Sequence, residues 1–191
     1  MRRGLARRFT VSAPGLKSLA VAGITDHPLF TGLTPQLVSR LVTVAKQLRV
    51  PSGTQLLREG ELGDGLYIVE EGTVEIEVSL GGTSGRTLAK LGPGDLVGEM
   101  AVLEEQPRSA AAVARTDAVV WFLPRQDVLD MIRECPDLAL RLLRELSRRL
   151  RQFNRLYLEQ TLQMERLALL GGFSACALGL VGLIRTFRRH R

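Results

Sequence analysis

Residues that hold metals or form disulfides are scarce in this 191-residue sequence. It has two cysteines, Cys135 and Cys176, and two histidines, His27 and His190, and neither cysteine has a partner at metal-ligand spacing. The sequence therefore argues against a disulfide framework and against a histidine-based site, and it predicts no metal and no cofactor. Paired catalytic carboxylates and a nucleophile elbow are also missing, so we do not expect an enzyme.

Acidic residues are missing from both ends of the chain. Four arginines lie in residues 1–8 and four more in residues 185–191, with no acid in either segment. The net charge is +6, so the body between the two ends is slightly acidic, and the ends are expected to contact something anionic. Residues 1–24 are predicted to be a basic, disordered arm, although an arginine-rich and acid-poor start also resembles an organelle transit peptide.

The first regular element is a predicted helix that begins at Thr34-Pro35. Threonine is a favoured N-cap residue, and proline is favoured at the first helical position. Leu37, Leu41, Val42 and Ala45 then share one face of the helix. Pro51-Ser52-Gly53 ends this pattern.

Between residues 54 and 124 the apolar residues follow the period of a strand. Short strands are predicted at residues 66–69, 74–78, 111–114 and 118–123, with a returning strand through Leu88 and Leu91 after a hairpin loop at 81–85. Turn residues recur about every 8–12 positions, which is typical of an all-β barrel or jelly roll. The helical period returns at 126–133, and a long helix follows from Pro136 to the pair Gly171-Gly172. The predicted fold class is α+β: a β-roll of short antiparallel strands flanked by helices, with a long C-terminal helix.

Two linked motifs stand out within the predicted strands. The first is Glu59-Gly60-Glu61-Leu62-Gly63-Asp64-Gly65-Leu66-Tyr67-Ile68-Val69-Glu70-Glu71-Gly72-Thr73-Val74. Its glycines Gly63 and Gly72 are expected in tight turns that require positive φ. The second motif is Gly94-Asp95-Leu96-Val97-Gly98-Glu99-Met100-Ala101, followed by Pro107-Arg108-Ser109-Ala110.

Together these motifs resemble the cyclic-nucleotide-binding domain, the sensor domain of catabolite activator proteins and of protein kinase regulatory subunits. The resemblance covers about residues 26–150, and residues 97–112 match the family's phosphate-binding cassette. It implies a cyclic mononucleotide as ligand, with cyclic AMP favoured over cyclic GMP. The ligand contacts it implies are Gly98, Glu99, Met100, Ala101, Arg108, Ser109 and Ala110. Val97 stands where the family usually has Phe, which we expect to alter packing under the cassette and not ligand chemistry.

The chemistry of the cassette residues suits such a ligand. Glu99 can accept a hydrogen bond from a ribose hydroxyl, and the planar fork of Arg108 can grip phosphate oxygens. Residues 99–104 are expected to form one short helix whose first N–H groups point at the anion. Gly98 lets the backbone approach the sugar. The alternative is a surface ion pair between Glu99 and Arg108 in a domain that has lost its ligand, but burying either charge unpaired is costly.

The long helix carries a heptad seam. Leu143, Leu146, Leu150, Phe153, Tyr157, Gln160, Met164 and Leu167 follow spacings of three and four, and Gln160 is the single polar member. Such a seam predicts a two-stranded coiled coil, and hence a homodimer through 143–167. A helix packed on its own barrel is the alternative. The arginines between the seam positions are read as a solvated face.

An uncharged run follows the seam, from Leu167 to Ile184 and between Arg166 and Arg185. It is about 27 Å long as a helix, near the lower limit for crossing a bilayer. Gly171, Ala175 and Gly179 have the small-residue spacing of paired membrane helices. A membrane anchor through 167–184 is therefore predicted, with an apolar dimer tail or a hairpin broken at 171–172 as alternatives. About 24 residues follow Leu167, too few for the DNA-binding module of the family's transcription factors.

Four segments follow: a basic arm (1–24), the β-roll (25–135), a dimerisation helix (136–167) and an apolar, arginine-capped tail (168–191). The predicted function is a dimeric cyclic-nucleotide sensor without a DNA-binding module, which signals to a protein partner that the sequence does not identify. The expected location is the cytoplasmic face of a membrane, with a cytoplasmic protein as the alternative. Two other functions stay open: a structural adaptor with a ligand-silent roll, and a nucleic-acid-associated regulator that uses the arginine-rich ends.

Overall fold

The computed structural model describes residues 10–11, 23–79 and 85–170. Two compact units divide the chain, residues 1–140 and 141–191. In chain order the helices and strands are β1 (Thr10–Val11), the 3-10 helix η3 (Pro28–Phe30), α2 (Pro35–Val44), β2 (Lys46–Val50), β3 (Gln55–Leu57), β4 (Gly65–Glu71), β5 (Val74–Ser79), β6 (Gly85–Leu91), β7 (Leu96–Val97), α3 (Glu99–Glu104), β8 (Ala111–Ala114), β9 (Ala118–Pro124), α4 (Arg125–Glu134) and α5 (Pro136–Leu170).

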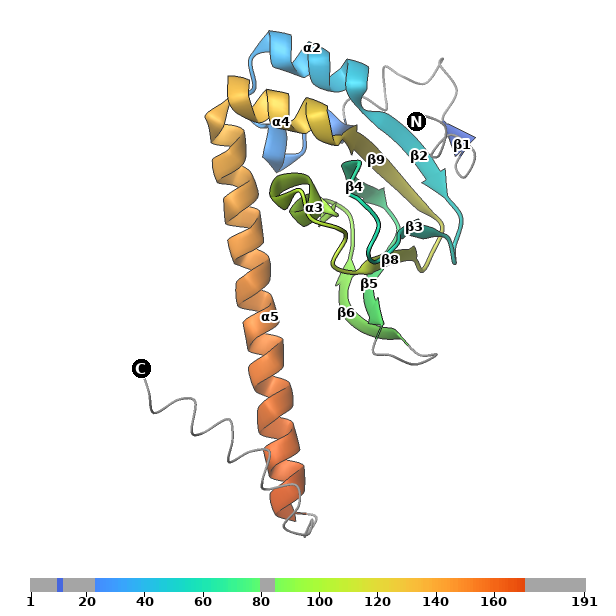
Figure 1. Cartoon of the computed structure of the whole chain (residues 1–191), viewed down its shortest axis with the longest axis vertical. Helices are drawn as coiled ribbons and strands as arrows, with labels where there is room; N and C mark the ends of the chain where they lie inside the picture. Colours follow the sequence, from blue (N-terminus) through green and yellow to red (C-terminus); the bar gives the residue numbers. More distant parts are fainter. Residues whose placement is uncertain (1–9, 12–22, 80–84, 171–191) are drawn as a thin grey trace. The chain divides into compact units, whose positions relative to one another are not determined.

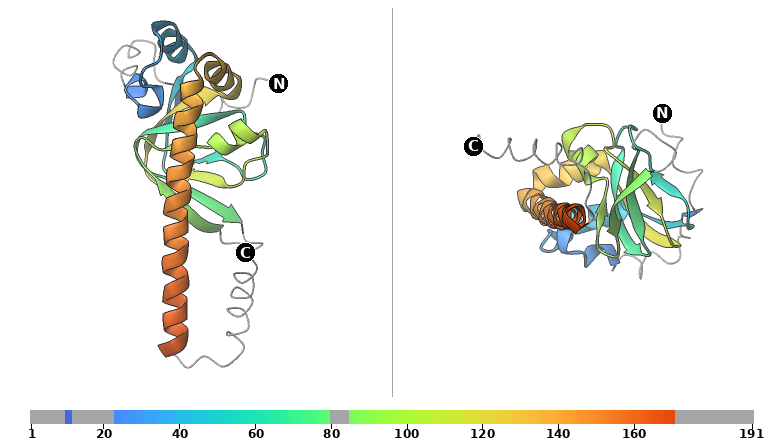
Figure 2. Two further views of the ribbon diagram at one scale, coloured as in Figure 1. Left: turned by 90° about the vertical axis from the view of Figure 1, so that its left-hand side faces the viewer. Right: turned by 90° about the horizontal axis from the view of Figure 1, so that it is seen from below.

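Two antiparallel sheets form the β-roll of the first unit. One has the strand order β1-β2-β9-β4-β7, and the other has the order β3-β8-β5-β6. In Figure 1 and in the left view of Figure 2, α2 and α4 lie together at one end of the strands, and α3 lies on their flank. The predicted α+β class with a roll of short antiparallel strands is confirmed, because two sheets of such strands enclose one core and helices flank them.

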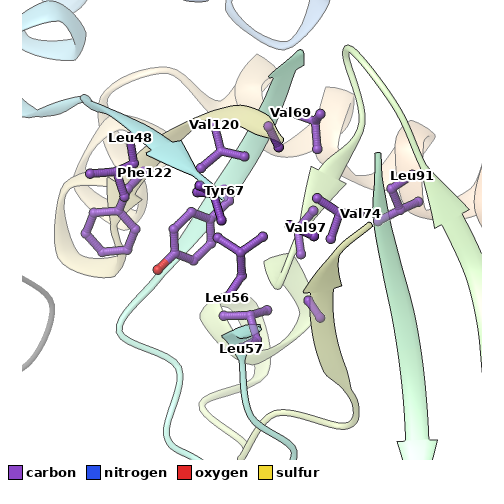
Figure 3. Close-up of a cluster of buried hydrophobic side chains, with 14 residues drawn as sticks. Leu48, Leu56, Leu57, Tyr67, Val69, Val74, Leu91, Val97, Val120 and Phe122 are labelled. Atoms are coloured by element: carbon purple, nitrogen blue, oxygen red, sulfur yellow. The ribbon is translucent and has the colours of Figure 1, made fainter. Parts of the chain in front are cut away.

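The core lies between the sheets and is built from strand residues that alternate in direction. Tyr67 of β4 pairs in register with Phe122 of β9, and their ring centroids are 5.0 Å apart at an interplanar angle of 47°. Figure 3 shows the two rings next to each other in a cluster that also contains Leu56, Leu57 and Val97. Val97 is fully buried in this cluster. The smaller side chain found here, in place of the family's usual Phe, is therefore part of the packing beneath the cassette.

Helix α2 follows the predicted start closely. The Thr34 hydroxyl oxygen accepts a hydrogen bond from the Leu37 backbone N–H at 3.4 Å, and Leu37 and Leu41 are buried. Ala45 is the C-cap of the helix and not part of its apolar face. The helix therefore ends one residue earlier than the apolar pattern suggested.

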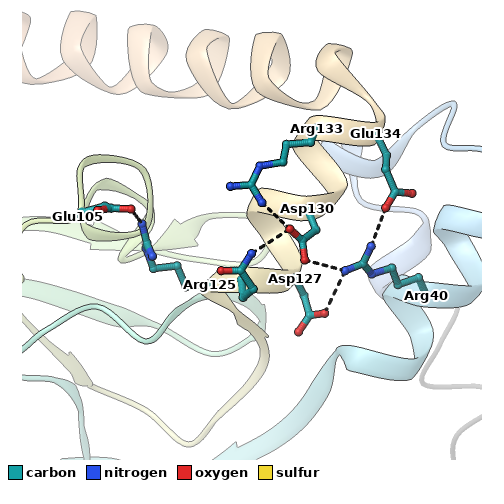
Figure 4. Close-up of polar contacts among 8 residues, drawn as sticks. Arg40, Glu105, Arg125, Asp127, Asp130, Arg133 and Glu134 are labelled. Atoms are coloured by element: carbon teal, nitrogen blue, oxygen red, sulfur yellow. Dashed lines mark hydrogen bonds and ion pairs between the residues drawn. The ribbon is translucent and has the colours of Figure 1, made fainter.

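Helices α2 and α4 lie side by side and are joined by the side chain of Arg40, which extends from α2 (Figures 1 and 4). The Arg40 guanidinium lies 3.5 Å from the Asp127 carboxylate, 3.1 Å from Asp130 and 2.7 Å from Glu134. These carboxylates are three and four residues apart on α4, so they share one face of that helix. A hydrogen bond from Gln126 lowers the pKa of Asp130, and Arg40 and Arg133 lower it further.

Several elements differ from the sequence-based expectations or lie outside them. Strands β2, β3 and β7 were not predicted. Thr10–Val11, within the arm predicted to be disordered, pair with Arg49 and Leu48 of β2, so the prediction was wrong at these two residues. The rest of that arm up to residue 22, and residues 81–84 of the predicted hairpin loop, lie outside the described residues.

The described part of the second unit is helix α5 from residue 141 onward. The helix ends at Leu170, next to the Gly171-Gly172 pair that was expected to break it. None of the helices in the described ranges is both long enough and apolar enough to cross a membrane. Residues 171–184 of the predicted anchor lie outside those ranges, as does the arginine-rich end at 185–191.

Candidate functional site

The turn between β7 and α3 shapes the first half of the site. Gly98 has φ 83° and is the N-cap of α3, which begins at Glu99. The Glu99 side chain is buried in the first turn, although it is a carboxylate. Ala101 is buried beside it, whereas Met100 points outward and is 45% exposed. The expected helix over 99–104 is confirmed.

Arg108 provides the second half of the site and is almost fully buried, at 4% exposure. Its Nη1 donates to the Gly98 carbonyl oxygen at 2.6 Å, and its Nη2 donates to the Gly65 carbonyl oxygen at 2.6 Å. The same Nη2 forms an ion pair with Asp64 at 3.2 Å. The guanidinium therefore joins the start of α3 to the start of β4.

The backbone of Arg108 is anchored to the loop that precedes β4. Its N–H donates to the Glu61 carbonyl oxygen at 2.8 Å, and its own carbonyl oxygen accepts from the Gly60 N–H at 2.9 Å. Leu62 and Pro107 form an isolated antiparallel bridge in the same place. The loop at 58–64 and the cassette thus form one hydrogen-bonded corner, which fixes the path of the chain on both sides of the arginine.

The glycines of the first motif have different reasons for being glycine. Gly72 has φ 86°, as expected for a tight turn. Gly63 has no positive φ, so the explanation from turn geometry was wrong for this residue. A Cβ at Gly63 would lie 2.7 Å from the Cβ of Ala101, and one at Gly65 would lie 2.3 Å from the Leu123 carbonyl oxygen. Gly63 is therefore required because α3 approaches the loop closely.

A buried tyrosine lies near these charges. Burial raises the pKa of the Tyr67 hydroxyl, the nearby Asp64 carboxylate raises it further, and Arg108 acts in the opposite direction. The hydroxyl therefore stays neutral at physiological pH. Tyr67 contributes a polar but uncharged group near the Arg108–Asp64 pair, so the fixed charges near Tyr67 are those of Asp64 and Arg108.

The structure brings some of the seven predicted contact residues together and leaves others apart. Gly98, Glu99, Ala101 and Arg108 converge at the corner between β7, α3 and β4. Met100 and Ser109 are exposed, and Ala110 is half-buried. The alternative of a surface ion pair between Glu99 and Arg108 does not hold, because both side chains are buried, and Arg108 pairs with Asp64. Asp64 was quoted in the first motif, but nothing local in the sequence shows that it meets a residue 44 positions later.

The burial of Arg108 does not by itself require a ligand. Two backbone carbonyls and Asp64 satisfy part of the guanidinium, so its burial does not by itself leave an unpaired charge. Arginine carries five N–H donors, however. The Nε–H and one Nη1–H make no hydrogen bond within the residues that the structure describes. Each of these N–H groups is a charge-assisted donor from which an oxyanion can accept a hydrogen bond.

The facing sheets, the positive-φ glycine at the start of a short helix, and the buried arginine define a regulatory β-roll built to hold an anionic ligand. A family model described as "Cyclic nucleotide-binding domain" matches residues 47–135. Residues 47–135 therefore form a cyclic-nucleotide-binding regulatory domain.

Several relatives share this domain. The cyclic AMP receptor protein of Thermus thermophilus is 44% identical over 126 residues, which cover 65% of this chain and 58% of that protein. A cyclic nucleotide-binding domain from Methylobacillus flagellatus has a TM-score of 0.67 at 25% identity, over 83% of this chain and 93% of that one. The regulatory domain of Toxoplasma gondii PKA, solved with cAMP, has a TM-score of 0.59 at 26% identity, over 69% of this chain and 51% of that one. The chain thus spans a little over half the length of the Thermus relative.

Replacing Gly98 with alanine should destabilise the site through two separate effects. An alanine at φ 83° is strained, and its Cβ would lie 2.4 Å from Arg108 Nη1, so the guanidinium must shift. We expect Gly98→Ala to lower the free energy of unfolding by about 2–3 kcal/mol, of which about 1 kcal/mol comes from the backbone. Chemical denaturation of the purified protein measures this change.

Two matched glycines separate these effects. Gly94 also has positive φ (84°) but has no atom within 4 Å of an added Cβ, so Gly94→Ala isolates the backbone cost. Gly92 has neither feature, and Gly92→Ala should be close to neutral. Equal losses for Gly98→Ala and Gly94→Ala would show that contact with Arg108 does not constrain position 98.

Proposed function

We propose that this chain is a cyclic-nucleotide-responsive regulator that binds cyclic AMP in preference to cyclic GMP, dimerises through α5, is tethered to a membrane by its C-terminal run and has no catalytic activity of its own. Signalling through a protein partner is part of the same proposal, with the cytoplasmic side of the membrane as the expected location. The observation that carries the proposal is the buried Arg108 guanidinium with donors to spare beside Gly98 and Glu99.

The site offers suitable partners for both charged and polar parts of such a ligand. The Nε–H and the second Nη1–H of Arg108 supply charge-assisted donors for a cyclic phosphate. Glu99, buried at the start of α3, provides carboxylate oxygens that a ribose hydroxyl can donate to. Glu99 lies on α3, and Arg108 is held by hydrogen bonds to Gly65 and Gly98, so little ordering is needed when a ligand binds.

The preference for cyclic AMP is supported by relatives and not by a base contact in the site. The Thermus relative is named a cyclic AMP receptor, and the Toxoplasma domain was solved with cAMP. Ser109 is exposed and has a hydroxyl that suits either purine. Discrimination between the bases therefore depends on groups other than the cassette residues.

A ligand-silent adaptor is the competing function, and one observation favours it. Asp64, Gly65 and Gly98 already bond the Arg108 guanidinium within the chain. A domain of this kind holds its arginine without any ligand. Ligand titration separates the two functions directly.

Isothermal titration of the full chain with cyclic AMP should give saturable heat, and Arg108→Ala should weaken binding on the order of 100-fold. The reason is the loss of two charge-assisted hydrogen bonds, each worth about 1.5–3 kcal/mol. The affinity of Arg108→Lys should lie between those of the wild type and Arg108→Ala, because lysine keeps the charge but loses the planar arrangement of N–H donors. Cyclic GMP, cyclic CMP and cyclic UMP titrated in parallel test the base preference.

Arg58→Ala is the matched control for this titration. Arg58 lies in the same corner of the roll, but its side chain is half exposed and pairs only loosely with Glu61, at 3.6 Å. Its removal should leave the affinity within about twofold, because exposed pairs of this kind contribute little. Absence of heat from the wild type with all four nucleotides, or an unchanged affinity in Arg108→Ala, would favour the silent adaptor.

The exposed face of α5 supports dimerisation. Leu143, Leu150, Phe153, Tyr157 and Met164 of the seam are 50–69% exposed in the single chain. Large apolar side chains in a row at spacings of three and four favour knobs-into-holes packing with a second helix of the same kind. Two copies of this seam provide the matching surface.

Leu150→Glu should therefore dissociate the dimer, with an increase in the dissociation constant on the order of 100-fold or more. Each lost leucine contributes about 1.5–3 kcal/mol of burial, and the dimer loses two. Leu158→Glu is the control, because Leu158 is equally exposed at 53% but lies outside the seam. Sedimentation equilibrium in mild detergent distinguishes the two variants. Equal behaviour of both would rule out the seam as the dimer contact.

Membrane tethering is supported by the uncharged run at 167–184 and its small-residue spacing. Leu178→Arg places a charge near the middle of this run, at a cost of about 2.5–3.5 kcal/mol for insertion. We expect the wild type in the carbonate-resistant membrane fraction and Leu178→Arg largely released from it. Leu158→Arg, outside the run, should fractionate as the wild type does. Recovery of the wild type in the carbonate supernatant would rule out a membrane span.

A further inference from the structure

Arg125, the first residue of α4, reaches across to the far end of the cassette helix. Its Nε donates to the Val102 carbonyl oxygen at 3.1 Å, and its Nη2 forms an ion pair with the Glu105 carboxylate. Figure 4 shows this side chain extending from the start of α4 to Glu105. Three quarters of the Arg125 side chain is buried, although it lies outside the predicted cassette.

The carbonyl that Arg125 bonds belongs to the last turn of α3. The last four carbonyls of any helix lack intrahelical partners, and a cation there also compensates the helix dipole. Helix α3 has only six residues, and its N-cap, Gly98, supplies no side-chain hydrogen bond. A helix this short is marginal without outside contacts. Arg125 provides such a contact at its C-terminal end.

Glu105 marks the place where the chain leaves α3. It has φ 58° and is the single non-glycine residue with positive φ in the described ranges. Such a conformation is uncommon and persists where surrounding contacts hold it. The Glu105 carboxylate is itself 73% exposed, so its ion pair with Arg125 is a weak one. The buried bond to the Val102 carbonyl is the stronger constraint.

The backbone of Arg125 is bonded to the other half of the site. Its N–H donates to the Asp64 carbonyl oxygen at 2.9 Å, and the Asp64 carboxylate holds Nη2 of Arg108 at 3.2 Å. Arg125 is thus bonded both to α3, which begins with Glu99, and to the loop at Asp64, which holds Arg108.

We propose that Arg125 is a positioning residue of the ligand site: it fixes α3 against the loop at Asp64 and so sets the distance between the ribose and phosphate contacts before any ligand binds. The expected effect of Arg125 on affinity rests on the function proposed above, whereas its expected effect on the order of α3 does not. A ligand whose binding-competent conformation is only partly populated binds more weakly in proportion to that fraction. Loss of Arg125 should therefore lower affinity although no atom of Arg125 lines the site.

The test uses the full chain in mild detergent, with two measurements on each protein. Hydrogen exchange of the amides of residues 99–105 without ligand reports the order of α3, and titration with cyclic AMP reports affinity. Arg125→Gln should speed exchange in α3 about tenfold or more, leave strands β4 and β9 unchanged, and weaken cyclic AMP binding about 5–30-fold. Arg125→Lys keeps a charge and one donor nitrogen, so it should recover part of both effects. It is the second variant if Arg125→Gln folds poorly.

Two controls separate positioning from general stability. Arg133→Gln removes an arginine from the same helix whose ion pair, with Asp130 at 2.6 Å, stays within α4, and it should change neither measurement. Glu105→Gln removes the exposed partner only and should change affinity less than about twofold.

The outcomes distinguish this inference from the proposed function. If exchange in α3 and affinity are both unchanged in Arg125→Gln, or if exchange rises equally in all strands, Arg125 is not a positioning residue. If the wild type binds no cyclic nucleotide, the proposed function fails, and selective loss of protection in α3 still decides whether Arg125 orders that helix.

Discussion

A guanidinium can be buried only where acceptors surround it, and the arrangement of this site depends on that constraint at Arg108. The two backbone carbonyls that accept its hydrogen bonds belong to Gly98, in the turn between β7 and α3, and to Gly65, at the start of β4. Leaving either carbonyl without this donor would cost about 1–3 kcal/mol, since both lie in the interior of the corner. The cation therefore fixes the β7–α3 turn against β4, and the short helix takes its position from this link.

Three glycines in this corner stand where a side chain would not fit. A Cβ at Gly98 would meet the guanidinium, one at Gly65 would meet the Leu123 carbonyl oxygen and the Phe122 ring, and one at Gly63 would meet Ala101. Backbone and cation are packed so closely that three positions have no space for a methyl group. A corner built this way is rigid, and rigidity lowers the entropy that a ligand must overcome on binding.

The general architecture of the fold could be predicted from the sequence because its strands are short apolar or alternating runs and its turns contain glycine. The helix at 35–44, the strands at 111–114 and 118–124 and the short helix at 99–104 all followed from local pattern. Strand β2 was missed because its five residues, Lys46 to Val50, follow α2 after a single residue and are too few for a clear period.

The site was predictable to the extent that its residues are close in sequence. Gly98, Glu99, Ala101 and Arg108 lie within one motif, and the structure brings them together. Asp64 and Arg125 were not identified as part of the site, because their contacts with Arg108 and Val102 depend on the pairing of β4 with β9, where Gly65 faces Pro124. The reason predicted for Gly63 was wrong. A positive φ and a close approach of distant segments both favour glycine, so the residue type alone does not show which of the two applies.

The ion pair of Asp64 with Arg108 places a carboxylate beside the donors that the proposed phosphate ligand would use. A phosphate that arrives at the guanidinium meets a carboxylate already in place, and two like charges about 4 Å apart repel each other by about 4 kcal/mol near a protein surface. Asp64 is 47% exposed, so water can solvate it and weaken this repulsion. In the proposed sensor, a fixed carboxylate beside the phosphate lowers the affinity, and a receptor of lower affinity releases its ligand sooner when the signal falls.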